Sequence, residues 1–333
     1  MRGYVFGMSF AAIGVFASAC TERSDNPDPT EQSESIAALS ATPTVSSRRS
    51  FQALAANQAL VLGSDGKLWI ENGPFGITLP PPRTQVDGNV VGFQALSTSN
   101  VYVLGSDGKL WLEHPNGAVP PPRTQVDANA IAVQALSTSD VFVQGSDGKL
   151  WLEHPNGAVP PPRLPVDANT VAFQALSASN VYVLGSDGKL WLEHPNGAVP
   201  PPRTQIDANA VAFQVLSPSF VYVLGSDGKL WLEQPNGAVP PPRTQVDANV
   251  IGFQALSSAT VLVLGSDGKL WLEQPTGAVP PPRTQVDANA ISFQALSTST
   301  VFVEGSDGKL WLEQAPFGTV PPARAIVDAN VHE

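Results

Sequence analysis

Aspartate recurs at one position of a repeated Gly-Ser-Asp-Gly tetrapeptide. Carboxylates that converge from several turns can coordinate a hard cation, and carboxylates set among other polar groups can bind the hydroxyls of a sugar. An aspartate in a tight turn more often accepts a hydrogen bond from an amide of that turn, and we favour this structural role. The aspartates retained as candidate ligand-binding residues are Asp107, Asp147, Asp187, Asp227, Asp267 and Asp307.

Arginine also recurs at a fixed position, directly after a run of prolines. Its guanidinium group could pair with a Glu113-type residue on a neighbouring strand, or it could present a planar fork to carboxylates or anionic glycans. We favour the first role and keep the second as the ligand-binding alternative. The arginines in this set are Arg83, Arg123, Arg163, Arg203, Arg243, Arg283 and Arg324.

Histidine occupies one repeated position as His114, His154 and His194, but Gln234 and Gln274 replace it in later repeats. A metal site built on this position would therefore lack a ligand in several repeats. A polar rim is the better interpretation, and we predict neither a metal site nor a cofactor.

Catalysis needs a nucleophile, a base and a stabilising group in one asymmetric constellation. This chain instead repeats the same residues once per unit, and isolated departures such as Glu304 are interpreted as sequence drift. We therefore predict that the protein is not an enzyme.

The tryptophans set the period of the repeat, because successive ones are about forty residues apart. The first interval is longer by two, since the segment 73–76 extends one loop. A buried tryptophan contributes a large apolar surface, so we expect these side chains in the core, with sugar stacking as the alternative. They are Trp69, Trp111, Trp151, Trp191, Trp231, Trp271 and Trp311.

Each unit contains short apolar runs separated by turn-forming residues, as in 93–96, 101–104 and 109–113. Such runs indicate strands, and the Asp-Gly pair between two of them is a strong hairpin signal. A weaker fourth strand follows at 124–126. Because a lone four-stranded sheet leaves apolar faces uncovered, we predict an all-β, seven-bladed β-propeller of four-stranded antiparallel blades, about 40 residues per blade. An open β-solenoid is the alternative.

The ends of the repeat array suggest how the ring closes. The first unit begins at Phe51 without a preceding Thr-Gln-Val-Asp segment, and the last ends with 326–331. The C-terminal segment is therefore predicted to supply the outer strand of the first blade. Alternate connections emerge on the same side of a blade, so the turns 106–108 and 127–129 should share one face.

The N-terminus has the features of a lipoprotein. Residues 1–19 combine a charged start with a short apolar centre, as in a secretory signal peptide. The following Ala-Ser-Ala-Cys resembles a bacterial lipobox, which makes Cys20 the predicted lipidation site. Residues 20–47, rich in Ser, Thr, Pro and acidic residues, should form a disordered tether, and 48–333 the propeller.

We expect export and lipid anchoring to the cell envelope, on the outer membrane if the host has two membranes. Ordinary cleavage before Cys20, which would leave a free thiol and a secreted soluble protein, is the alternative. The formal charge of −11 argues against a nucleic-acid partner. Contact with the membrane is predicted through the N-terminal lipid only, and the protein is expected to be a monomer.

The sequence of 101–113 resembles the blades of tectonin-type and tachylectin-like propellers, whose Val-aromatic-Val strand leads through a short polar turn into a Leu-aromatic strand. The resemblance covers residues 51–333 at the level of the blade. It implies a propeller fold and lectin-like carbohydrate binding, but none of the family's ligand-binding residues can be matched to this chain. The predicted function is a surface-anchored, multivalent glycan-binding module, with a protein-interaction scaffold in the cell envelope as the alternative.

Overall fold

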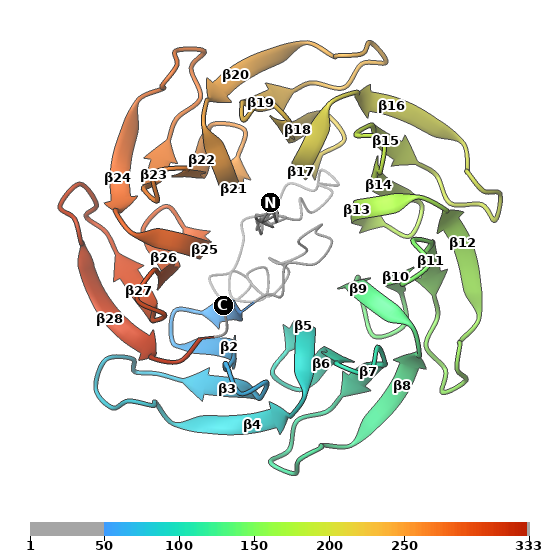
Figure 1. Ribbon diagram of the computed structural model, residues 1–333, viewed down its shortest axis with the longest axis horizontal. Helices are drawn as coiled ribbons and strands as arrows, with labels where there is room; N and C mark the ends of the chain where they lie inside the picture. The colour runs from blue at the N-terminus through green and yellow to red at the C-terminus, as the bar shows by residue number, and fades with distance from the viewer. Residues whose placement is uncertain (1–49, 332–333) are drawn as a thin grey trace, which may run out of the picture.

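The computed structural model describes residues 50–331, which form seven four-stranded antiparallel sheets around a central axis (Figure 1). The predicted seven-bladed β-propeller is therefore confirmed, and we number its blades 1 to 7 in chain order. The predicted signal peptide 1–19, the tether 20–47 and the lipidation site Cys20 lie outside the described residues. Within the described residues, no helix has the length and apolar character needed to cross a membrane.

Each blade contributes four consecutive strands, from the central axis outward (Figure 1). The innermost strands are β1 (Phe51–Ala55), β5 (Val90–Ser97), β9 (Ala130–Ala135), β13 (Thr170–Ser177), β17 (Ala210–Ser217), β21 (Val250–Ser257) and β25 (Ala290–Ser297). The second strands are β2 (Gln58–Leu62), β6 (Asn100–Gly105), β10 (Val141–Gly145), β14 (Asn180–Gly185), β18 (Phe220–Gly225), β22 (Thr260–Gly265) and β26 (Thr300–Gly305).

The third strands are β3 (Leu68–Asn72), β7 (Leu110–Glu113), β11 (Leu150–Glu153), β15 (Leu190–Glu193), β19 (Leu230–Glu233), β23 (Leu270–Glu273) and β27 (Leu310–Gln314). The outer strands are β4 (Arg83–Asp87), β8 (Arg123–Asp127), β12 (Arg163–Asp167), β16 (Arg203–Asp207), β20 (Arg243–Asp247), β24 (Arg283–Asp287) and β28 (Ala323–Asp328).

The tight turn between the second and third strands depends on two glycines, shown here in blade 2. Gly108 has a φ of +76°, a conformation that other L-residues rarely adopt. A Cβ atom at Gly105 would lie only 2.7 Å from Oδ1 of Asp107. That oxygen accepts a hydrogen bond from the Lys109 amide at 3.1 Å, so the glycine makes room for the carboxylate that holds the turn.

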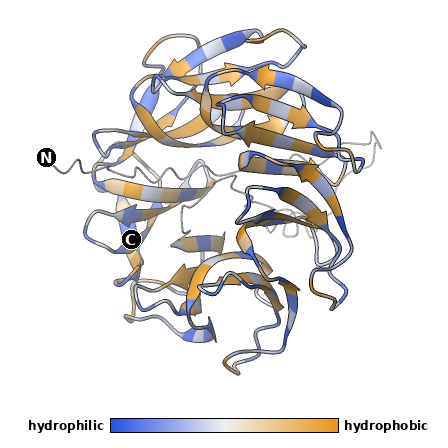
Figure 2. Cartoon of the chain, turned by 45° about the vertical axis from the view of Figure 1, so that its right-hand side comes forward, coloured by the Kyte–Doolittle hydropathy of each residue, from blue (hydrophilic) through white to orange (hydrophobic). Residues whose placement is uncertain are grey.

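The hydrophobic core lies between blades rather than within one blade. Tyr102, Leu112 and Val126 of blade 2 pack against Val141 and Val143 of blade 3. Six further clusters join the other neighbouring pairs in the same way, and Figure 2 shows hydrophobic residues running along the strands. Because each blade buries both of its faces, its second strand is mostly apolar instead of alternating with polar residues.

A ring of buried glutamines connects the innermost strands. The Gln214 side chain of blade 5 donates to the Ala255 carbonyl of blade 6 at 2.8 Å and accepts from the Ala255 amide at 2.7 Å. This reciprocal pair occurs at all seven junctions, including the one between blades 7 and 1. The glutamines are Gln52, Gln94, Gln134, Gln174, Gln214, Gln254 and Gln294.

The predicted mode of ring closure is wrong. The C-terminal segment does not join blade 1, because β28 pairs with β27 of its own blade. Blade 1 already has an outer strand, β4, which pairs with β3. The prediction treated the Thr-Gln-Val-Asp segment as lying before its blade, whereas in each unit this segment follows the third strand and pairs with it.

The junction between blades 7 and 1 is closed by other contacts. Val331 forms an isolated antiparallel bridge with Gly63, and Phe51 packs close to Phe302 in a shared apolar cluster. Glu304, interpreted above as drift, is buried at this junction and accepts hydrogen bonds from Ser50 at 2.5 Å and Ser292 at 2.7 Å. Glu304 therefore makes a contact that is specific to the junction between blades 7 and 1.

Candidate functional site

The two kinds of aspartate turn lie on one face of the ring, as predicted. The Ser146 amide of blade 3 donates to the carbonyl of Asn129, the last residue of the Asp-Ala-Asn turn that leaves blade 2, at 2.9 Å. We call this face the Asp-turn face. On the opposite face, His114 Nδ1 lies 3.3 Å from the Ser99 carbonyl oxygen, so we call it the Ser-turn face.

The candidate aspartates hold their own turns, as we favoured from the sequence. Asp147 accepts a hydrogen bond from the Lys149 amide at 3.1 Å and pairs with its ammonium group at 2.7 Å. The side-chain hydrogen bond from Lys149 lowers the pKa of Asp147 below its ordinary value. Its carboxylate remains about half exposed, so it is also open to a ligand. The other five predicted aspartates and Asp65 of blade 1 have the same lysine contact.

Each candidate arginine covers the face of the tryptophan in its own blade. The guanidinium carbon of Arg163 lies 4.1 Å from the ring centroid of Trp151, within the range of a cation–π interaction. The remaining six pairs lie at 4.1–4.2 Å. Arg163 also faces two carboxylates, Glu153 of its own blade at 3.6 Å and Asp127 of blade 2 at 3.7 Å. The arginines therefore connect blades, as well as lying near the surface.

The prediction that the tryptophans belong to the core is wrong. All seven are only partly buried. Trp151 lies directly across from Val143 in the sheet, on the face that turns toward blade 2, whereas Leu150 and Leu152 are buried. Adjacent blades diverge with distance from the axis (Figure 1). An indole on the third strand therefore lies in a groove that its arginine only partly fills.

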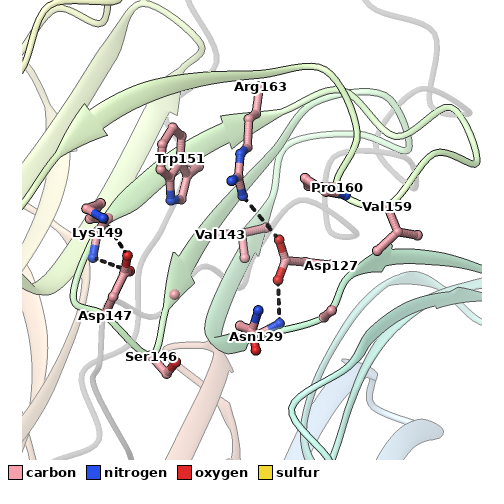
Figure 3. Close-up of a pocket in the computed structure, with 12 residues that line it drawn as sticks. Asp127, Asn129, Val143, Ser146, Asp147, Lys149, Trp151, Val159, Pro160 and Arg163 are labelled. Carbon is pink, nitrogen blue, oxygen red and sulfur yellow. Dashed lines mark hydrogen bonds and ion pairs between the residues drawn. The ribbon is translucent and has the colours of Figure 1, made fainter.

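The structure brings one member of each predicted set together in a groove between blades 2 and 3. This cavity, which we call the 2/3 groove, measures about 320 Å³, near the lower end of the range for small-molecule sites. Figure 3 shows Trp151 and Arg163 along one part of the wall, and Asp147 and Lys149 along another. Val159 and Pro160 also line the groove.

Sequence reasoning missed two polar residues of the 2/3 groove. Ser146 lines it beside Asp147, and Asn129 lines it beside Asp127 (Figure 3). Among residues 50–331, neither the Asn129 side-chain amide nor the Ser146 hydroxyl has a hydrogen-bond partner. Both recur in every unit of the sequence, and that regularity is the signal that could have identified them.

Residues that line the groove are nearly invariant from blade to blade. Across the seven units the only replacements are Gly88 for the Ala128-type residue and Leu79 for the Val159-type residue. By contrast, the last position of the turn on the Ser-turn face changes repeatedly. In blades 2 to 7 it is Asn100, Asp140, Asn180, Phe220, Thr260 and Thr300. The residues that line the 2/3 groove are therefore repeated, nearly unchanged, at the other six junctions.

The groove has the chemistry of a binding site. It offers a tryptophan, hydrogen-bonding groups of both kinds and two ion pairs. In the part of the chain that the structure describes, no group of three or more His, Cys, Asp or Glu residues could hold a metal ion.

No protein family and no curated protein sequence matches this chain. Solved structures do match its fold. The computationally designed Ika8 protein is 12% identical with a TM-score of 0.54, and the match covers 87% of this chain and 91% of that one. YCF48 from Cyanidioschyzon merolae is 15% identical with a TM-score of 0.55, covering 78% and 92%.

The WD40 β-propeller domain of Doa1 is 11% identical with a TM-score of 0.56, and the match covers 80% of this chain and 94% of that domain. Identities this low show the fold alone. The chain is a seven-bladed β-propeller.

Proposed function

We propose that this protein is a non-enzymatic, multivalent carbohydrate-binding module whose sites are the grooves between neighbouring blades. The observation that carries the proposal is the sevenfold repetition of a partly buried tryptophan beside hydrogen-bonding groups of both kinds. A pyranose ring has an apolar face and a rim of hydroxyls. In the 2/3 groove the part of the Trp151 indole that Arg163 leaves uncovered matches the apolar face, and Asn129 and Ser146 match the hydroxyls. The resemblance to tectonin-type and tachylectin-like blades points to the same ligand class.

The charges in the groove favour a neutral sugar over an anionic one. Arg163 already faces two carboxylates, and Lys149 is paired with Asp147. An anionic glycan would have to compete with these carboxylates, and the chain carries a formal charge of −11. Sugar hydroxyls can instead donate to the exposed carboxylate of Asp147 without breaking either ion pair.

Because the groove residues are repeated around the ring, each site can bind weakly and the protein can still bind a glycan surface tightly. When several sites on one rigid ring bind a surface at once, avidity exceeds the single-site affinity by about 10²–10⁴-fold. We therefore expect the protein to bind dense or polymeric glycans far better than free monosaccharides.

Enlarging the serine in every groove tests the proposal. We expect the full chain to bind neutral polysaccharides on a glycan array, and we expect substitution of the seven serines by glutamine to reduce that binding by at least about 10²-fold, since every site narrows together. The serines are Ser64, Ser106, Ser146, Ser186, Ser226, Ser266 and Ser306.

The matched control makes the same change on the Ser-turn face, at Ser99, Ser139, Ser179, Ser219 and Ser299. This control variant should bind like the wild type. An array on which the folded wild type binds no glycan would contradict the proposal. So would a loss of binding only in the control, which would place the site on the opposite face.

A protein-interaction scaffold is the second candidate function, and one observation favours it. Each long loop presents an exposed valine or leucine directly before a cis proline, for example Val119, which is 49% exposed. Seven such apolar points around the rim could contact an envelope protein. Crosslinking in the native envelope should then yield one dominant protein partner that competing glycans do not displace.

We also propose, from the sequence alone, that Cys20 anchors the mature protein to the cell envelope. The intact mass of the protein from its native host should include acyl chains on that residue. A Cys20→Ala variant should lack this mass and leave the membrane fraction. A wild-type mass without acyl chains would favour the alternative, a secreted protein with a free thiol.

A further inference from the structure

A fully buried glutamate ends the predicted Leu-Trp-Leu-Glu or Leu-Trp-Ile-Glu run of every blade. Its side chain is 0% exposed at all seven positions. Each of these glutamates faces the arginine of its own blade and, across the junction, the aspartate that ends the outer strand of the preceding blade. The glutamates are Glu71, Glu113, Glu153, Glu193, Glu233, Glu273 and Glu313.

The groups at each junction are two carboxyls and one guanidinium. Between blades 2 and 3, Arg163 Nη1 lies 3.6 Å from Glu153 Oε1 and 3.7 Å from Asp127 Oδ2. Asp127 Oδ1 accepts a hydrogen bond from the Asn129 amide at 2.6 Å. Both carboxyl oxygens of Glu153 are buried without a hydrogen-bond partner among the described residues.

The same arrangement closes the ring. At the junction of blades 7 and 1, Arg83 lies 3.7 Å from both Glu71 and Asp328. Across all seven junctions the arginine–glutamate distances are 3.2–3.9 Å and the arginine–aspartate distances 2.9–3.8 Å. At least one oxygen of every one of these glutamates lacks a hydrogen-bond partner in the described part of the chain.

A proton on the glutamate removes the excess negative charge at the junction. Two ionised carboxylates next to one guanidinium leave one buried negative charge uncompensated, which is costly at a junction where the glutamate is fully buried. When Glu153 is protonated, its hydroxyl can donate to Asp127 Oδ2, and the single charge of Asp127 then balances that of Arg163. The two carboxyls thus act as a carboxylic acid–carboxylate pair.

The pKa values of the glutamates agree with this geometry. Burial, and then the neighbouring aspartate, raise the pKa of Glu153 to about 8, although Arg163 acts in the opposite direction. The pKa is also about 8 for Glu113, Glu193, Glu233 and Glu273, and about 9 for Glu71 and Glu313.

We propose that every blade junction holds one proton between its buried glutamate and the aspartate of the preceding blade, so that the ring stores seven protons at neutral pH and its junctions weaken when alkali removes them. Each released proton moves from a glutamate oxygen to solvent. The ionised glutamate then adds a second negative charge beside the single arginine of the junction. Arg163 and Asp127 also line the 2/3 groove, so the new charge appears directly behind its wall.

The dependence of stability on pH follows from the raised pKa. An unfolded chain loses these protons near the ordinary glutamate pKa of about 4.3, whereas the folded ring keeps them until about pH 8–9. Between these values the folded state binds more protons than the unfolded state. Stability is therefore greatest below the unfolded pKa and declines as the pH rises through the folded pKa.

Potentiometric titration of the full chain tests the proposal directly. Between about pH 7 and about pH 9, below the range in which unfolded tyrosines ionise, we expect the folded protein to release up to seven protons more than the same chain in urea, because the unfolded glutamates have already ionised. Taking the difference between the two states removes the histidines, the cysteine and the amino terminus, which titrate in both. Infrared spectra should show a protonated carboxyl band at pH 7 that disappears over the same interval.

A double variant, Glu153→Gln with Glu193→Gln, should release two protons fewer and lose less thermal stability between pH 7 and pH 9. Glutamine keeps a donor for the aspartate, so the ring should still fold. The control Asp147→Asn removes an exposed turn carboxylate and should leave the proton count in this range unchanged. Coincident folded and unfolded titrations above about pH 7 would overturn the proposal, and so would an unchanged count in the double variant.

Discussion

Replacing Gln214 with methionine will lower the free energy of unfolding by about 2–5 kcal/mol, since two buried backbone groups lose their partners. The glutamine side chain occupies the free edge of β21, where it pairs with both the amide and the carbonyl of Ala255. Both residues are 0% exposed. Methionine has a similar volume but neither donates nor accepts these bonds, so the loss reports on hydrogen bonding rather than on a cavity.

Gln234→Met is the matched control, because Gln234 is exposed on the Ser-turn face. We expect this variant to change stability by no more than about 0.5 kcal/mol, as surface substitutions usually do. Urea denaturation of both variants at one pH measures the difference. Equal stabilities for the two variants would show that the glutamine ring does not hold the blades together.

The fold could be predicted from the sequence because its information is local and repeated. The interval between tryptophans, the Asp-Gly hairpin and the apolar runs are each contained within about 40 residues. They recur in every unit, and the units can cover one another's apolar faces by forming a ring of blades. The face shared by the turns of 106–108 and 127–129 followed from the alternation of antiparallel strands.

The contacts between blades were harder to foresee. Gln94 lies in the run Phe-Gln-Ala-Leu, which was interpreted as an apolar strand, yet its amide binds the next blade. Glu113 was considered only as a partner of Arg123, yet it is fully buried, and Arg123 also pairs with Asp87 of the preceding blade. The signal present in the sequence was that neither residue type ever changes from unit to unit.

The site could be predicted only in part. Arg163 and Asp147 do line one groove, but Trp151 was expected in the core. Its exposure depends on the distance of the third strand from the ring axis, which no single unit reveals. Asn129 and Ser146 were missed because turn residues of these types have a structural explanation in almost any hairpin.

The strand that pairs with the C-terminal segment was predicted incorrectly, and a truncation can test the pairing of β28 with β27 that the structure shows. Deleting residues 323–333 removes β28, and with it Val327 and Val331, which are 0% and 4% exposed at the junction with blade 1. We expect stability to fall by about 5 kcal/mol or more, given about 1.5–3 kcal/mol for each buried aliphatic side chain and the loss of a strand ladder. A typical domain is stable by only about 5–15 kcal/mol, so the truncated ring should open or aggregate through the exposed edge of β27.

Hydrogen exchange identifies which blade loses its strand. In the truncated chain the amides of β27 that pair with β28 should lose protection, whereas β3 should keep the protection that β4 provides. Removing only residues 332–333 is the control and should leave both strands protected. If β3 lost its protection while β27 kept it, the C-terminal segment would belong to blade 1 after all. Because a blade here is one uninterrupted stretch of chain, no strand is shared across a junction among residues 50–331. The glutamine and carboxyl contacts between blades, together with backbone hydrogen bonds such as that from the Ser64 amide to the Asn330 carbonyl, carry the closure that a shared strand would otherwise provide.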